Sequence, residues 1–153
     1  MSRTALTSDP PDCSAAVMQR LTLPRQLDQL APLRNAIAQV MAGLERQRVN
    51  AMTLAAFEAA TNIIRHATVP SGDTAITAII ERTIHQISVE LVYAGTPFIP
   101  PAQLEPDFSG ESSGGFGLYM MAASVDRVSY GAPATGLASI HLASDLPHEP
   151  AAA

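Results

Sequence analysis

Three polar side chains recur every four residues in the otherwise apolar segment FEAATNIIRHA, residues 57–67. They are Glu58, Asn62 and His66. Residues four apart lie on the same ridge of a helix, so this spacing aligns a carboxylate, a carboxamide and an imidazole. Oxygen atoms of the first two suit a divalent cation and a phosphate, particularly when alanines half-bury them. The segment therefore predicts a candidate metal and phosphate site on a helix.

Ordinary structural roles exist for the same residues. Asn62 could cap or bridge backbone groups, and Glu58 could pair with Arg65 or with a basic residue of the preceding helix. Polar residues inside helices most often face water or local partners, so these roles are favoured for each residue taken alone. His66 is expected to be a packing and helix-terminus residue, and no Cys/His spacing predicts zinc.

A cluster of glycines, Gly114, Gly115 and Gly117, precedes a short apolar segment that ends near Val125. Such a junction lets backbone N–H groups and a helix N-terminus approach an anion. Alone, the cluster is more often a tight connection between elements. Together with the carboxylate and carboxamide of the first segment, it favours a phosphate site more specifically.

The apolar periodicity predicts the elements that must position these residues. We expect an edge strand at 17–23, helices at 27–44 and 49–66, strands at 75–82 and 86–93, a long functional loop at 95–114, a short helix up to 125, and a closing hairpin within 126–143. This order predicts an α+β fold, a two-layer sandwich of helices on a mostly antiparallel, mixed sheet. One domain at 17–143 would lie between a disordered arm, 1–16, and a frayed tail, 144–153.

Composition restricts the classes of function. The 153 residues carry a formal net charge of −5, with nine basic against fourteen acidic side chains, which argues against direct binding of nucleic acid. The single cysteine, Cys13, excludes an internal disulfide, and no apolar run is long enough for a membrane span. We expect a cytoplasmic protein that does not enter a membrane.

Three motifs in order resemble the boxes of the GHKL superfamily of ATP-binding domains, and most closely the anti-sigma-factor serine kinases of bacterial partner-switching systems. FEAATNIIRHA resembles the N-box, YAGTPF at 93–98 resembles the middle Asp-x-Gly box, and SGGFGLYMM at 113–121 resembles the last glycine box. VDRVSYG at 125–131 resembles the closing strand of the family. The resemblance covers residues 17–143 and implies the Bergerat fold of that superfamily.

The resemblance also implies roles for individual residues. Glu58 would be the general base, and Asn62 would hold Mg²⁺. The remaining positions that would bind the nucleotide are Tyr93, Gly95, Gly114, Gly115 and Gly117. ATP and Mg²⁺ would be the cofactors, a sigma factor or a STAS-type anti-anti-sigma protein the partner, and a homodimer the expected assembly.

Two departures from the family pattern bear on activity. Tyr93 stands where the family has the aspartate that accepts a hydrogen bond from the adenine amino group. Between Thr96 and Met121 there is no Lys or Arg to neutralise a phosphate, whereas Glu105, Asp107 and Glu111 add negative charge. The resulting hypothesis is a partner-switching regulator with an impaired ATP site. Arg65 or Arg127 could approach the phosphates from elsewhere.

Two alternatives stay open from the sequence. One is an active serine kinase that phosphorylates a STAS-domain partner. The other is the ATPase part of a two-component histidine kinase, which is a poorer match because residues 1–16 are too short and polar to supply a phospho-acceptor helix pair.

Overall fold

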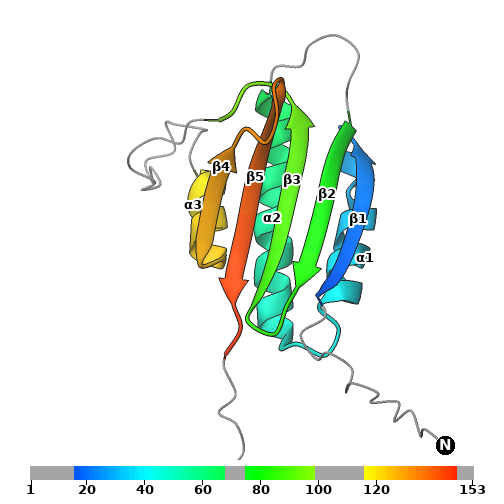
Figure 1. The fold of residues 1–153 in the computed structure, drawn as a ribbon, viewed down its shortest axis with the longest axis vertical. Helices are drawn as coiled ribbons and strands as arrows, with labels where there is room; N and C mark the ends of the chain where they lie inside the picture. Colours follow the sequence, from blue (N-terminus) through cyan, green and yellow to red (C-terminus); the bar gives the residue numbers. More distant parts are fainter. Residues whose placement is uncertain (1–15, 68–74, 99–115, 148–153) are drawn as a thin grey trace, which may run out of the picture.

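The chain forms a two-layer α+β fold (Figure 1). The computed structural model describes residues 16–67, 75–98 and 116–147. Its elements are β1 (Val17–Pro24), the 3-10 turn η1 (Leu27–Gln29), α1 (Ala31–Val40), α2 (Arg46–His66), β2 (Ala75–Arg82), β3 (Gln86–Ala94), α3 (Phe116–Ser124), β4 (Arg127–Gly131) and β5 (Leu137–Asp145). The helices cover one face of the sheet, which confirms the predicted fold class.

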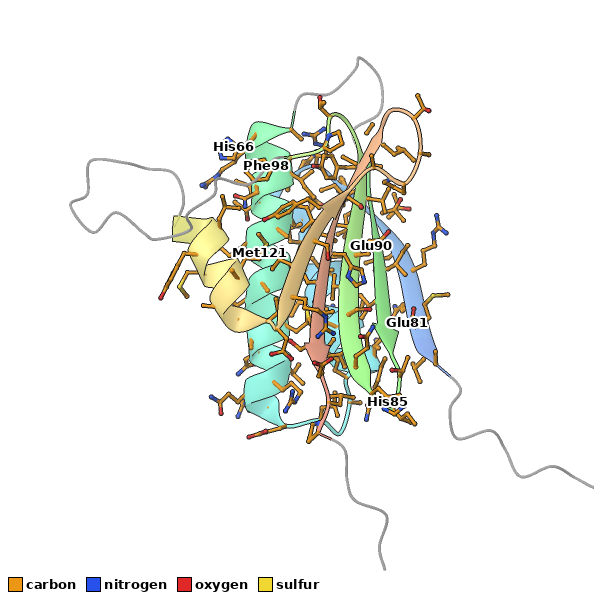
Figure 2. The ribbon with its side chains drawn as sticks, turned by 60° about the vertical axis from the view of Figure 1, so that its left-hand side comes forward. His66, Glu81, His85, Glu90, Phe98 and Met121 are labelled. Atoms are coloured by element: carbon orange, nitrogen blue, oxygen red, sulfur yellow. The ribbon has the colours of Figure 1, made fainter. Side chains whose placement is uncertain are left out.

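The sheet has five strands in the order β1-β2-β3-β5-β4. All four strand pairs in the described part of the chain are antiparallel, so the mixed pairing in our expectation is wrong. The first strand lies at an edge, as predicted. One cross-strand row joins Leu23, Ile76, Tyr93 and Ala138 on the helix-covered face. In Figure 2, Glu81 and Glu90 are labelled on the opposite face, which none of the described helices covers.

The element boundaries differ from expectation in three places. The helix expected at 27–44 is divided into η1 and the ten-residue α1, whose second residue is Pro32. A turn follows in which Gly43 adopts a φ of +84°, a conformation that side chains disfavour. Helix α2 begins three residues early, at Arg46, and β5 continues through Ser144 to Asp145, so the first two residues of the expected tail belong to the sheet.

The core lies between α1, α2 and the sheet. The sheet-facing side of α2 is rich in alanine, since Ala55, Ala56, Ala59 and Ala60 are all fully buried. Small side chains allow the helix backbone to lie close to the strands, where branched residues such as Ile80 and Leu91 fill the space. None of the helices in the described residues is both long and apolar enough to cross a membrane.

Arginine side chains satisfy backbone carbonyls where elements end. Arg82 of β2 donates hydrogen bonds to the carbonyls of Val40 (3.4 Å) and Ala42 (2.8 Å), at the end of α1. Arg48 of α2 donates to the Asp145 carbonyl at 2.9 Å, at the end of β5. Because the last carbonyls of a helix have no partner within it, Arg82 bonds to otherwise unsatisfied groups at the end of α1, while Arg48 ties α2 to the end of β5.

Candidate functional site

Helices α2 and α3 bring three of the predicted site residues together. A Cβ atom placed on Gly117 would lie 2.6 Å from Oε2 of Glu58 and 3.9 Å from Oδ1 of Asn62. The backbone of the last glycine box therefore contacts the ridge of the N-box-like segment directly. Only glycine permits this approach without displacing the carboxylate.

The carboxylate of Glu58 lies against the first turn of α3, because Gly117 is the second residue of that helix. The N-terminus of a helix carries unpaired N–H groups and a partial positive charge, which interact favourably with an anion. This arrangement places the carboxylate in the environment that a phosphate oxygen would also favour.

The structural roles considered for Glu58 and Asn62 are not observed within the described residues. The one ion pair there joins Arg127 to Asp145 at 2.8 Å, so Glu58 has no charged partner. The amide nitrogen of Asn62, Nδ2, is buried and has no hydrogen-bond partner. Arg65, one candidate partner, is exposed. An unpaired buried donor is unusual in a folded protein and marks a group with a further partner to find.

His66 does not share this environment. It is the last residue of α2, is exposed, and is labelled at the end of that helix in Figure 2. Together with Arg65 it places basic groups in the last turn, where the helix dipole favours them. The ridge of three therefore divides into a pair at the site, Glu58 and Asn62, and a helix-terminus residue.

Tyr93 lies in the core rather than at the surface. Its side chain is 4% exposed and shares the helix-covered face of β3 with Leu91 and Val89, as the alternation predicts. Burial raises the pKa of the phenol, and the nearby charge of Arg25 partly opposes that shift. The hydroxyl therefore stays protonated at neutral pH and carries a proton to donate.

Arg25 was missed by the sequence reasoning. Its Nη2 atom donates to the carbonyls of Ile63 and Ala67, both at 2.9 Å, and so caps the end of α2. Its Nη1 atom is buried without a hydrogen-bond partner in the described part of the chain. In the sequence, Arg25 stands out only as an arginine directly after Pro24, where the first strand ends. It belongs to no motif.

Aromatic side chains surround this end of the site. The rings of Phe98, from the middle box, and Tyr130, from β4, have centroids 5.4 Å apart at an interplanar angle of 49°. Burial, and then the proximity of Tyr93, raise the pKa of Tyr130. We call Tyr93, Phe98 and Tyr130 the aromatic cluster. Of its members, Tyr93 is the one on which the charge of Arg25 acts.

The remaining predicted residues have other positions. Gly95, with a φ of +150°, donates its N–H to the Gly136 carbonyl at 3.0 Å and joins the middle box to the turn between β4 and β5. Gly114, Gly115 and the acidic residues 105, 107 and 111 lie outside the described residues. Arg127 is held by Asp145. The described ranges contain no group of three or more His, Cys, Asp or Glu that could hold a metal.

Comparison with known protein families identifies the chain. A family model described as the histidine kinase-like ATPase domain matches residues 23–138, which include the N-box-like ridge, Tyr93 and Gly117. A search of curated proteins gives no significant match. Domains of the matched family generally bind ATP and Mg²⁺. Since the matched residues make up most of the chain, it belongs to the histidine kinase-like ATPase (GHKL) family.

Proposed function

We propose that this chain is a partner-switching regulator of the anti-sigma-factor kinase type, which binds a sigma factor or a STAS-type anti-anti-sigma protein, and that its nucleotide site is impaired for ATP. The burial of Tyr93 carries the proposal. At the position of the adenine-reading aspartate, a phenol fills core space on the helix-covered face of the sheet and is only 4% exposed.

The chemistry at this position opposes adenine. The amino group of adenine is a hydrogen-bond donor and requires an acceptor such as a carboxylate. A buried phenol with a raised pKa stays neutral, so its oxygen accepts a hydrogen bond more weakly than a carboxylate, and the neighbouring guanidinium of Arg25 has only donors. Leaving a donor unmatched in a buried site costs about 1–3 kcal/mol, before the volume of the extra ring is counted.

The two ends of the site differ in how well they fit Mg-ATP. At the phosphate end, Glu58 and Asn62 meet the glycine box, and Asn62 is the residue that would hold Mg²⁺. At the other end, where adenine would bind and which we call the base end, the aromatic cluster and Arg25 supply no carboxylate. The proposed impairment therefore concerns the recognition of adenine. It leaves Glu58, the proposed proton acceptor, unchanged.

An active serine kinase is the second candidate, and the contact of Glu58 with Gly117 supports it. Bound Mg-ATP would supply the phosphoryl group for such a reaction. In that case Glu58 would accept the proton of a serine hydroxyl on the partner, while the amide of Asn62 and the first turn of α3 position the reacting groups.

Calorimetric titration with Mg-ATP tests the proposal. We expect weak or undetectable binding to the natural chain, and low-micromolar affinity would refute the impairment. Tyr93→Asp restores an acceptor and should raise ATP affinity about five- to 150-fold, the equivalent of about 1–3 kcal/mol. Tyr93→Phe is the matched control, because it retains the ring without supplying a carboxylate, and it should not raise the affinity.

Phosphate transfer to a partner separates the two candidates. Radiolabelled ATP is incubated with the chain and a STAS-domain protein encoded beside it. Transfer that Glu58→Gln abolishes would establish the kinase. A stable complex with the STAS protein or a sigma factor, formed equally with and without ATP, is the result expected of the regulator.

A further inference from the structure

Two buried side-chain atoms in the described residues have no hydrogen-bond partner, and both are donors. They are Nη1 of Arg25 and Nδ2 of Asn62. Within the described residues, no buried side-chain acceptor is left unsatisfied in the same way. Both unpaired groups are donors, so a ligand that satisfies either of them must present an acceptor.

The position of Arg25 is fixed from one side. Its Nη2 atom makes two hydrogen bonds to the end of α2, with the carbonyls of Ile63 and Ala67, so the planar guanidinium cannot turn freely. The opposite nitrogen, Nη1, is consequently held in a buried position. The guanidinium acts electrostatically on the phenol of Tyr93, which places the two groups in the same environment.

The charge of Arg25 is only partly compensated. Its hydrogen-bond partners are the two carbonyls at the C-terminus of α2, where the helix dipole contributes about half an elementary negative charge. No carboxylate in the described part of the chain forms an ion pair with it. The side chain is partly buried, and an unsatisfied buried nitrogen such as Nη1 often marks an ion or ligand site.

We propose that Arg25 is the ligand-reading residue at the base end of this site and that it binds a small anionic group, a carboxylate or a phosphate, through the free Nη1 side of its guanidinium. A guanidinium recognises these planar or tetrahedral oxygen anions with strong, charge-assisted hydrogen bonds. The phenol hydroxyl of Tyr93 can donate to the same anion. The inference rests on the proposed function only in assuming that adenine does not occupy this end.

Side-chain NMR tests the proposal on the natural chain. The guanidinium ¹⁵N–¹H signal of Arg25 is assigned by its loss in Arg25→Lys and followed during titration with inorganic phosphate and, separately, with acetate. Sodium chloride at equal ionic strength is the control for screening. We expect a saturable shift with phosphate, acetate or both, and the stronger of the two identifies the source of the anion.

Thermal denaturation in the same salts supplies a second measurement. Each protein is compared with its own baseline, so that the lost cap on α2 does not affect the comparison. The anion-dependent rise in Tm should be absent in Arg25→Met, and Arg25→Lys should weaken the apparent affinity about tenfold or more, because lysine lacks the planar fork. Arg127→Met, an exposed arginine at β4, is the matched control and should keep the full effect.

The outcomes are distinct. If phosphate and acetate act no more strongly than chloride, or if Arg25→Met keeps the anion effect, Arg25 is a structural cap alone and the inference is wrong. Low-micromolar binding of Mg-ATP would refute the proposed function. The anion titration would still be a separate result, because phosphate and acetate contain no nucleobase.

Discussion

The close approach of Gly117 to Glu58 makes a quantitative prediction about coupling between α2 and α3. In Gly117→Ala, the new Cβ would lie 2.6 Å from Oε2 of Glu58, about 0.8 Å short of ordinary van der Waals contact. The carboxylate is the far end of a flexible side chain, and Cδ is already 3.7 Å away, so the carboxylate should rotate while α3 stays in place.

The expected energies largely cancel in the single variant. Displacing the carboxylate from the first turn of α3 costs about 0.3–1 kcal/mol, and alanine gains up to about 1 kcal/mol over glycine in a helix. Gly117→Ala alone should therefore change the free energy of unfolding by less than about 0.5 kcal/mol. In a Glu58→Ala background the cost disappears, and the same substitution should stabilise the protein by up to about 1 kcal/mol.

Urea denaturation of the four proteins in this double-mutant cycle measures the coupling. We expect an interaction energy of about 0.3–1 kcal/mol, the cost of displacing the carboxylate. Gly131→Ala is the matched control, because its Cβ would meet Ser139 Oγ at 3.1 Å, far from Glu58 in the sequence and on β4. It should add to Glu58→Ala within about 0.3–0.5 kcal/mol. Additive behaviour of Gly117→Ala would refute the contact, and a loss above about 3 kcal/mol would refute rotation of the carboxylate.

Two further predictions concern the other end of the site. Arg25→Met removes two hydrogen bonds from the end of α2, and we expect a loss of about 2–3 kcal/mol in urea denaturation; an unchanged midpoint would contradict the capping role. The pKa values of Tyr93 and Tyr130 are raised in the folded state, so their contribution to stability is present below the unfolded pKa of about 10 and is lost as the pH rises through the folded values. Stability measured from pH 9 to 12 should therefore fall less steeply in Tyr93→Phe than in the natural chain, and parallel curves would contradict the burial argument.

Local patterns were enough to predict part of the fold and of the site. The period of two in β3 placed Tyr93 on the core face, and the four-residue spacing in α2 placed Glu58 and Asn62 on one ridge. The sequence combined this ridge with the glycine cluster in one candidate phosphate site, and in the structure Gly117 lies against Glu58. These features depend on residues close together in the chain or on boxes that occur as a set.

Other features depend on contacts between distant residues and gave no local signal. Arg25 bonds to carbonyls 38 and 42 residues away, and a backbone acceptor leaves no trace in the sequence. The extension of β5 depends on pairing with β3, where Asp145 opposes Gln86, and on the bond from the Leu146 N–H to the His85 carbonyl. The pattern of polar and apolar residues in a single segment does not show with which strand a polar extension will pair.

The arginine contacts at the ends of the elements have a mechanical consequence. Helix α2 is tied to β5 near its N-terminus through Arg48 and to the end of β1 at its C-terminus through Arg25, so it is fixed to the sheet at both ends. Within the described residues, α3 has no comparable tie, since Ser124 Oγ bonds only to its own helix at the Met120 carbonyl. The wall of the site that carries Glu58 is therefore held to the sheet by hydrogen bonds at both ends, whereas α3 is held by packing, with Met121 fully buried.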